Sequence, residues 1–290
     1  MLTPHREHRS MKCHFAGIAV GIFAAGLISV SAMQPVHAQT SQAQSAEIWN
    51  SFKADVFGAR PIAMADPGAL QIMAPKRAQD AGLVPVDIRF NPGAAKDKIV
   101  AVTLIVDVNP SPLAAVFKIG EGSGVSKISL RLRVNDYSIV RAIAETAGGG
   151  LLMAETYVKA TGGCSAPAVR NPQEAKATMG VMKLRQFPPE AGAAANGKRE
   201  LQLMIRHPNH SGFQMDQVTR YYIPPHFINK VTVSQDGGTI LGMEGGISIS
   251  EDPNFRFDYH IRSASPLKAE AVDTEGNVFR GEWPLEAAGL

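Results

Sequence analysis

The sequence predicts an all-β protein of two β-sandwich domains joined by a linker, with a short helix before the first domain. Three observations support this. Apolar and polar residues alternate with a period of two in many short segments, as in half-buried strands. Turn-forming residues separate these segments at the spacing typical of a sandwich. A stretch without sustained alternation, residues 161–198, divides the strand-rich sequence into two parts.

The first 38 residues have the composition of a secretory signal peptide. Arg6, Arg9 and Lys12 precede an apolar run from Phe15 to Val30, and Val36-His37-Ala38 fits a small-x-small cleavage site. The run is shorter than the roughly 20 residues that span a bilayer. We therefore expect residues 1–38 to be removed and the protein to be periplasmic, without a membrane anchor. A retained anchor is the alternative.

The charge balance argues against a nucleic-acid partner. Removing three of the 29 basic residues and one of the 26 acidic residues with the leader leaves 26 and 25. No polybasic tract remains in the rest of the chain, so an electrostatic footprint for nucleic acid is absent from the sequence.

A short helix is expected at the start of the mature chain. Ser45 can cap it and Gly58 can end it. Its apolar residues fall on one helical face, which predicts packing across the first domain; they are Ile48, Trp49, Phe52 and Val56.

Strands follow in the first domain, which we place at residues 39–160. Apolar positions alternate from Val84 to Phe90, and Asn91-Pro92-Gly93 then forms a turn. The further strand candidates of this domain are residues 99–106, 113–119, 127–134, 138–143 and 151–158.

Residues 161–198 are interpreted as a Cys-bearing arm and an interdomain linker. The stretch opens with Thr161-Gly162-Gly163-Cys164 and closes with Pro188-Pro189 and the small residues 191–197. A short helix can form within residues 173–185.

Strand patterns return in the second domain, residues 199–290. Leu201, Leu203 and Ile205 alternate with polar residues, and so do the apolar positions from Phe255 to Ile261. Two hairpins complete the second sandwich, one formed by residues 227–233 and 239–243 and one by residues 267–272 and 278–283.

Cys164 is the leading candidate for chemistry. It is the only cysteine after the predicted leader, because Cys13 lies before the cleavage site. Gly162 and Gly163 precede it, and glycine leaves the backbone free to move. We therefore expect an exposed, mobile thiol that reagents label about as fast as a peptide thiol, with a pKa near 8.5. A buried inert thiol and an intermolecular disulfide are the alternatives.

Two histidines suggest a metal site as a second hypothesis. His207 and His210 form His-x-x-His, and His226 lies nearby in the sequence together with several methionines, so a periplasmic copper site is conceivable. Pro208 and Gly212 instead indicate a turn in which both histidines are solvated. We expect both histidines to be solvated turn residues, and we expect neither a metal nor a resident cofactor.

Signals for an enzyme are weak. The Gly-rich segment 120–124 lacks the Gly-Lys-Ser/Thr ending of a phosphate loop, and no Gly-x-Ser-x-Gly elbow is present. A cysteine in a linker is also a poor place for a preorganised catalytic triad. We therefore expect a protein that is not an enzyme.

Several segments resemble SoxY and SoxZ, the two partners of the sulfur carrier of bacterial thiosulfate oxidation. Residues 158–164 resemble the end of SoxY, where a strand leads into a Gly-Gly-Cys arm. Residues 206–212, 223–228, 231–233 and 252–257 resemble SoxZ. Because the SoxY-like segment precedes the SoxZ-like segments, the chain is similar to a fused SoxYZ of the kind associated with quinoprotein dehydrogenases. The resemblance implies two immunoglobulin-like sandwiches and covalent attachment of sulfur to Cys164.

The leading hypothesis is thus a periplasmic carrier that holds a sulfur species on Cys164 and presents it to partners. Sulfur-oxidation enzymes, c-type cytochromes and a quinoprotein dehydrogenase are the expected partners. Two other functions stay open. One is a binding or chaperone module for a periplasmic dehydrogenase. The other is a copper-handling protein that uses His207 and His210.

Overall fold

The computed structural model describes residues 36–290 except 92–93, 96, 168–170, 189–197 and 287–290. Pro35–Leu290 forms one compact unit. The predicted signal peptide lies outside the described residues, apart from its last three, which begin the first helix. Among the described residues, no helix has the length and apolarity needed to cross a membrane.

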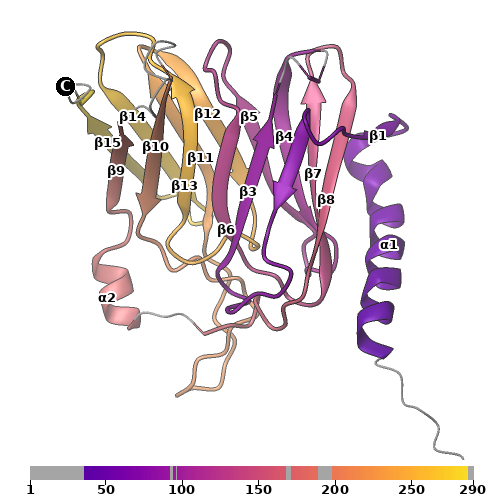
Figure 1. Cartoon of the computed structure of the whole chain (residues 1–290). Coiled ribbons are helices and arrows are strands. Elements are labelled where there is room, and N and C mark those ends of the chain that lie inside the picture. The colour runs from indigo at the N-terminus through magenta and orange to yellow at the C-terminus, as the bar shows by residue number, and fades with distance from the viewer. Residues whose placement is uncertain (1–35, 92–93, 96, 168–170, 189–197, 287–290) are drawn as a thin grey trace, which may run out of the picture. The chain divides into compact units, whose positions relative to one another are not determined.

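Helix α1 (Val36–Phe57) lies beside one end of a large sheet, as Figure 1 shows. It is longer than the short helix that the sequence predicts. Trp49 and Phe57 are buried in a small apolar cluster with side chains of that sheet. The guanidinium of Arg141 lies 4.7 Å from the ring centroid of Trp49, so a cation–π contact adds to this packing.

Eight strands make up the first half of the unit. Their bounds are β1 (Ile62–Met64), β2 (Leu70–Met73), β3 (Val84–Phe90), β4 (Ile99–Val106), β5 (Leu113–Ile119), β6 (Lys127–Leu132), β7 (Ser138–Thr146) and β8 (Leu151–Val158). The predicted strands of this half are confirmed, and β1 and β2 are additional.

The second half follows α2 (Pro172–Ala177). Its strands are β9 (Met182–Phe187), β10 (Lys198–Ile205), β11 (Ile228–Gln235), β12 (Gly238–Gly245), β13 (Asn254–His260), β14 (Leu267–Asp273) and β15 (Val278–Trp283). Both predicted hairpins form, because β11 pairs with β12 and β14 pairs with β15 in antiparallel fashion.

The strands form two sheets over one hydrophobic core. The nine-stranded sheet has the order β1-β8-β7-β4-β5-β12-β11-β14-β15, and the six-stranded sheet has the order β2-β3-β6-β13-β10-β9. Phe117 of one sheet meets Phe255 of the other edge to face at 6.3 Å between ring centroids. Strands β3, β6, β10 and β13 turn their alternate apolar residues toward this core, which explains the period of two in the sequence.

Both sheets run through both halves of the chain. In the large sheet β5 pairs with β12, and in the small sheet β6 pairs with β13. The sequence pattern suggested two bodies joined by a linker, but strands of the two halves hydrogen-bond side by side. The structure is mostly β with two helices, which agrees with the predicted class in part, whereas the assignment to immunoglobulin-like sandwiches stays a prediction.

The predicted linker contains regular structure. Asn171 caps α2 by accepting a hydrogen bond from the backbone N–H of Gln173 at 2.9 Å, and the helix ends at Ala177. Strand β9 then pairs with β10 at the edge of the six-stranded sheet. The interpretation of this stretch as a simple linker is therefore wrong at residues 182–187, which alternate along an edge strand.

Candidate functional site

Cys164 lies six residues after the end of β8, in a segment that is held along its backbone. The N–H of Gly162 donates to the carbonyl of Asn135 at 2.7 Å, and the N–H of Gly163 donates to the carbonyl of Val134 at 3.1 Å. Both acceptors lie two or three residues after the end of β6. The segment that the sequence suggests as a mobile arm is thus bound to the first half.

The two glycines before the cysteine serve close packing. A Cβ atom at Gly163 would lie 2.2 Å from the carbonyl oxygen of Ala81 and 2.6 Å from that of Val134, so no side chain fits there. Gly162 has a φ of +79°, in the left-handed region that favours glycine. The structure therefore explains why glycine stands at both positions by close packing and by backbone conformation, without invoking flexibility.

The Cys164 side chain is 0% exposed. Burial raises the pKa of its thiol to about 11, and the positive charge of Arg133 opposes this shift only in part. The expectation of an exposed thiol with a near-ordinary pKa is wrong for this conformation. A neutral, covered thiol cannot react before the segment moves.

The second half of the chain covers the cysteine from the other side. The Ser211 hydroxyl donates to the carbonyl of Cys164, and the Gln214 side-chain amide donates to the carbonyl of Ala166 at 2.9 Å. Ser211 and Gln214 are both buried. The cysteine segment is therefore enclosed between the two halves.

Arg133, a residue of the first half, bonds to both the cysteine segment and the second half. Its guanidinium donates to the carbonyl of Gly163 and to that of Asn209, each at 3.2 Å. The residue is 2% exposed, and burial lowers the pKa of its guanidinium. In the described part of the chain its Nε has no hydrogen-bond partner. A buried positive charge next to the thiol favours an anionic sulfur on Cys164 over a neutral one.

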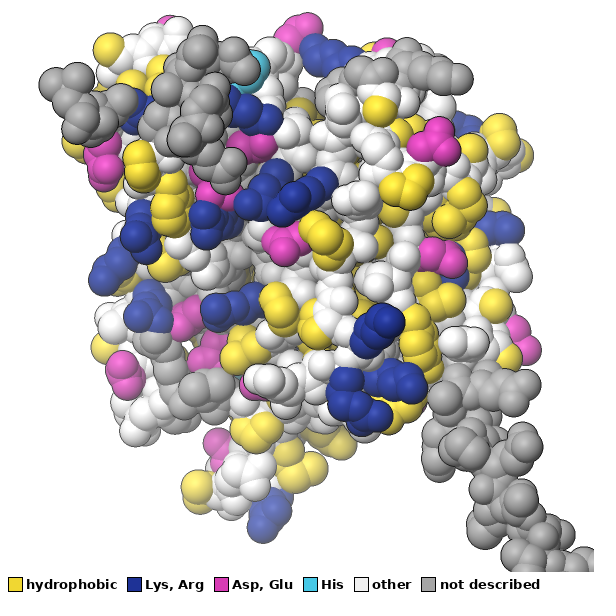
Figure 2. Space-filling view, viewed as in Figure 1, with side chains coloured by type: hydrophobic (Ala, Val, Ile, Leu, Met, Phe, Trp, Pro, Cys, Tyr) yellow, Lys and Arg dark blue, Asp and Glu magenta, His cyan; other side chains and the backbone are white. Residues whose placement is uncertain are grey.

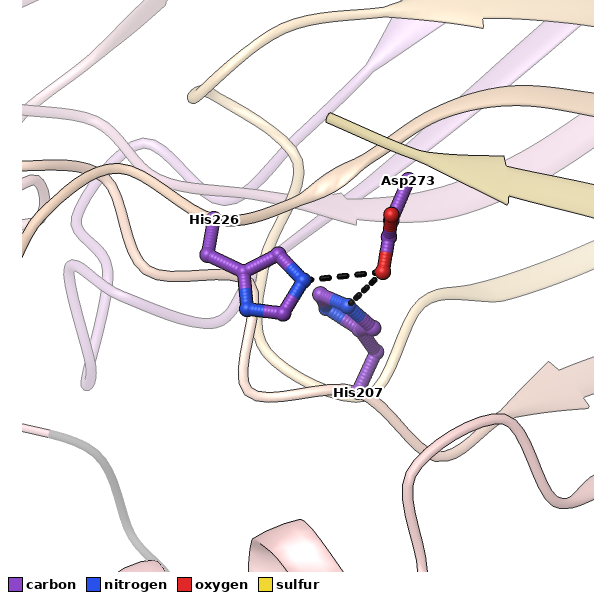
Figure 3. A group of neighbouring side chains, drawn as sticks. All are labelled: His207, His226 and Asp273. Carbon is purple, nitrogen blue, oxygen red and sulfur yellow. Dashed lines mark hydrogen bonds and ion pairs between the residues drawn. The ribbon is translucent and has the colours of Figure 1, made fainter. Parts of the chain in front are cut away.

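His207 is buried in a cluster with His226 and Asp273, as Figure 3 shows. Nε2 of His226 lies 2.8 Å from Oδ2 of Asp273, and Nε2 of His207 lies 3.5 Å from the same oxygen. The two imidazole rings meet edge to face at 4.7 Å. The prediction that His207 is a solvated turn residue is wrong, and the sequence pattern paired it with the wrong histidine.

His210 is bonded elsewhere. Its Nδ1 lies 3.1 Å from Oε1 of Gln214, and that oxygen also accepts a hydrogen bond from the N–H of Ser211. His207 and His210 therefore belong to different networks, and the structure does not bring them together as a ligand pair.

Hydrogen bonding in the histidine cluster disfavours a metal ion. The N–H of Asn209 donates to Nδ1 of His207 at 3.1 Å, so the ring proton resides on Nε2, the atom that faces Asp273. A protonated Nε2 has no lone pair for a metal. Oδ2 of Asp273 also accepts a hydrogen bond from the Asn277 side chain. The carboxylate of Asp273 is thus held by hydrogen bonds with His226 and Asn277, while Nε2 of His207 has no hydrogen-bond partner among the described residues.

A cavity of about 400 Å³ on the six-stranded sheet offers no alternative reactive centre. Its charged lining is largely self-paired, with Lys127 2.8 Å from Glu200 and Lys198 2.6 Å from Asp258. Its described lining does not include Cys164. Cys164 with its covering residues is therefore the candidate site.

Sequence reasoning identified Cys164 and both glycines, but it missed the residues that hydrogen-bond to the backbone of the cysteine segment. Ser211 lies inside the 206–212 motif, so the sequence drew attention to this segment. It gave no sign that Ser211 bonds to the cysteine segment. Arg133 lies within an alternating strand pattern in which it reads as solvent-facing, and only the structure shows its burial.

Comparison with protein families gives two matches that share the chain. Residues 53–164 match the model of the sulfur oxidation protein SoxY, and residues 185–284 match that of the sulphur oxidation protein SoxZ. Comparison with curated proteins gives no match. The first match ends at Cys164, and the second begins in β9.

Proposed function

Because the chain is a fusion of a SoxY domain and a SoxZ domain, and thus a SoxYZ-like sulfur carrier, we propose that it carries a sulfur intermediate covalently on Cys164. SoxYZ is a non-catalytic carrier family whose partners are Sox sulfur-oxidation enzymes. The proposal adds the attachment residue and the way in which the thiol is held between encounters.

The observation that carries this proposal is the position of Cys164. The SoxY match ends at this residue, and the sequence contains no other cysteine after the predicted leader. Both halves of the chain also contribute hydrogen bonds to the segment, through the carbonyl of Val134 on one side and the Ser211 hydroxyl on the other. The fusion thus positions the only thiol after the predicted leader where the two domains meet.

Loading by exchange is compatible with this site. When the segment is released, the Cys164 thiolate attacks one sulfur of an S–S bond in a substrate held by a partner enzyme. A new S–S bond to Cys164 forms as the old bond breaks, and the departing sulfur keeps the electron pair, so no separate oxidant is needed.

We further propose that the protein is exported and acts in the periplasm, with c-type cytochromes and a quinoprotein dehydrogenase among its partners. The basic and apolar composition of residues 1–38 supports export. The quinoprotein partner is supported by the resemblance to fused carriers alone.

The test is the intact mass of the protein purified from its host without reducing agent. We expect a chain that begins at or near Gln39 and carries a sulfur adduct that dithiothreitol removes. Peptide mapping should place the adduct on Cys164, and Cys164→Ser should fold with an unchanged melting temperature but carry none. A wild-type chain that stays free of adduct while its host oxidises sulfur would overturn the proposal.

A further inference from the structure

A hairpin of residues 210–226 projects from the unit at the end where the cysteine segment lies. His210 pairs with His226 at its base, and Met215 pairs with Tyr222 farther out. The N–H of Asp216 donates to the carbonyl of Tyr221 at 2.9 Å, which closes the outer part. This 210–226 hairpin is the salmon-to-orange loop at the bottom of Figure 1.

The outer part of the hairpin exposes large apolar side chains. Val218 is 90% exposed, Tyr221 78% and Tyr222 65%, and Phe213 and Met215 are also exposed. Figure 2 shows apolar side chains gathered at this lower end, with acidic and basic groups beside them. Exposed aromatic groups that cluster in this way mark protein interaction sites.

The tip holds this surface in a fixed shape. Oδ1 of Asp216 accepts hydrogen bonds from the N–H of Val218 at 2.9 Å and from the N–H of Thr219 at 2.7 Å. Arg220 adopts a φ of +62° and donates its N–H to the carbonyl of Asp216. A surface that is already ordered loses little conformational entropy on binding, which favours association.

The base of the same hairpin holds the cysteine segment. Ser211 and Gln214 donate to the carbonyls of Cys164 and Ala166, and they are bonded to each other through the N–H of Ser211. The N–H of Phe213 donates in turn to the Ser211 hydroxyl at 3.2 Å. A force that moves the exposed part of the hairpin therefore acts on the hydrogen bonds that hold the thiol in place.

We propose that the 210–226 hairpin is the docking surface for a Sox sulfur-oxidation enzyme, and that docking draws Ser211 and Gln214 away from the cysteine segment and exposes Cys164 to that enzyme. This inference rests on the proposed carrier function. An enzyme that acts on Cys164 has to approach the place where the thiol emerges, and the hairpin is the exposed apolar surface bonded to that place. A second copy of the chain bound to the hairpin would block access to Cys164 but would not take up the sulfur that it carries.

The experiment uses the full chain and the purified Sox sulfur-oxidation enzymes of its host, one at a time. Binding is measured by calorimetry, and the accessibility of Cys164 by its rate of reaction with a maleimide. We expect one of the enzymes to bind and to raise the labelling rate by at least about tenfold. The double variant Val218→Asp/Tyr221→Asp should bind that enzyme at least about tenfold more weakly and show no such increase.

Two further variants distinguish the binding of the enzyme from the hydrogen bonds that hold the cysteine segment. Met64→Asp places the same charge on a 60% exposed apolar residue of β1 and should bind as the wild type does. Gln214→Met removes the donor to Ala166 while keeping the side-chain volume, and it should raise the labelling rate without any enzyme. The tip variant alone should label as slowly as the wild type.

Four results would overturn the inference. The tip variant could bind the enzyme as tightly as the wild type, or binding could leave the labelling of Cys164 unchanged. Sedimentation could also show that the wild type self-associates and the tip variant does not, which would assign the hairpin to a second copy. If the wild-type chain binds none of the enzymes, this inference fails, whereas the proposed carrier function fails only if Cys164 also carries no sulfur adduct.

Discussion

At Gly163 the backbone passes so close to Ala81 and Val134 that a methyl group would overlap their backbone atoms. This contact gives the Gly-Gly-Cys sequence a meaning different from the one that its composition suggests. The glycines let the segment approach the first half closely enough to bury the next residue, Cys164. Glycine for flexibility and glycine for close packing predict different effects of a substitution on the labelling rate of Cys164.

The first prediction concerns Gly163→Ala. If glycine served flexibility, alanine would stiffen the arm and leave the labelling of an exposed thiol nearly unchanged. The structure predicts that the new methyl group pushes the segment out of its position, at a cost of about 1–3 kcal/mol. Labelling of Cys164 should then become at least about tenfold faster than in the wild type, measured with a maleimide under native conditions.

Gly68→Ala is the control for this substitution, because a Cβ at Gly68 meets nothing within 4 Å. Its labelling rate should equal that of the wild type, which is slow because a pKa of about 11 leaves roughly one hundredth of the thiolate that a thiol with a pKa of 9.0 has. Wild-type labelling as fast as that of a free thiol would contradict the buried site.

Part of the site could be predicted from the sequence at this scale. Cys164 stood out because it is alone after the leader, and a lone thiol in a glycine-rich segment is visible without a structure. Its burial was not visible, because Ala81, Val134 and Ser211 lie far from it in the sequence. A glycine also looks the same in sequence whether it serves motion or close contact.

At the scale of elements, the end of β14 is tied to two loops of the second half. Asp273 closes β14, and its carboxylate accepts hydrogen bonds from the backbone of Glu275 and Asn277 and from the side chain of Asn277. The same carboxylate contacts His226 and His207. These contacts fix the base of the 210–226 hairpin, because His226 is its last residue.

The second prediction follows from two shifted pKa values in this link. Burial, with a smaller effect of His226, lowers the pKa of His207 from 6.5 to about 4. An unfolded histidine thus binds its proton at a higher pH than buried His207 does. The free energy of unfolding should therefore fall as the pH drops from 6.5 to 4, by about 3 kcal/mol from this residue.

Asp273 extends the loss to lower pH. Desolvation favours its protonated form, but the hydrogen bonds from Asn277 and His226 outweigh this and lower its pKa from 3.8 to about 2. Its contribution to stability is present above pH 3.8 and disappears as the pH falls toward 2. Urea unfolding between pH 7 and 2 checks both residues.

His207→Asn serves as the control in the pH series, since it removes the titrating group. The variant should be less stable at pH 7 and show a flatter profile between pH 6.5 and 4. Some slope should persist, because burial also lowers the pKa of His210. A profile as steep as that of the wild type would show that His207 is not the group responsible.

Most strands could be predicted from the sequence, and the exceptions have physical reasons. Alternation identified β3, β6, β10 and β13 because each has one face on the core. Strand β9 was assigned to the linker, and its first four residues fall within the range 173–185 in which a short helix was expected. As an edge strand it buries few of its residues, so its pattern carries little signal. Strand β1 has three residues, too few to show a period.

The whole molecule is unified by strand pairs that cross between the two halves. Phe117 of β5 lies opposite Met243 of β12, and Phe257 of β13 lies opposite Ile128 of β6. A hydrophobic core that draws residues from both halves lies between the sheets. Unfolding of one half would expose the core and the sheet edge of the other.

The third prediction is a single cooperative unfolding transition. The chain contains two tryptophans, Trp49 in α1 and Trp283 in β15, so Trp49→Phe and Trp283→Phe each leave one reporter in one half. Fluorescence of the two variants should give the same unfolding midpoint once the effect of each substitution on stability is subtracted. Two separate midpoints would show that the halves unfold independently.

Phe117→Ala sharpens this test. Phe117 is fully buried at the junction and contacts Phe255 across the core. Its truncation should destabilise the molecule by about 3–5 kcal/mol. Because the transition is shared, both reporters should move to lower denaturant together, whereas independent halves would shift one reporter more than the other.

The pairing of the halves could not be predicted from the sequence. Periodicity identifies which residues of a strand face the core, but it does not say which strand lies beside it. In β5 and β12 the neighbours are more than 100 positions apart, as the pair Phe117 and Met243 shows. Two separate sandwiches and two continuous sheets give the same alternation along the chain.

The continuous sheets have a consequence for how the carrier responds to dilution. Two separate subunits joined through β5–β12 and β6–β13 would obey mass action, and their complex would dissociate as its concentration fell. In one chain the same pairing is unimolecular, with an effective concentration on the order of millimolar or higher for a short connection. The thiol and the hairpin that covers it thus remain in a ratio of one to one at any expression level.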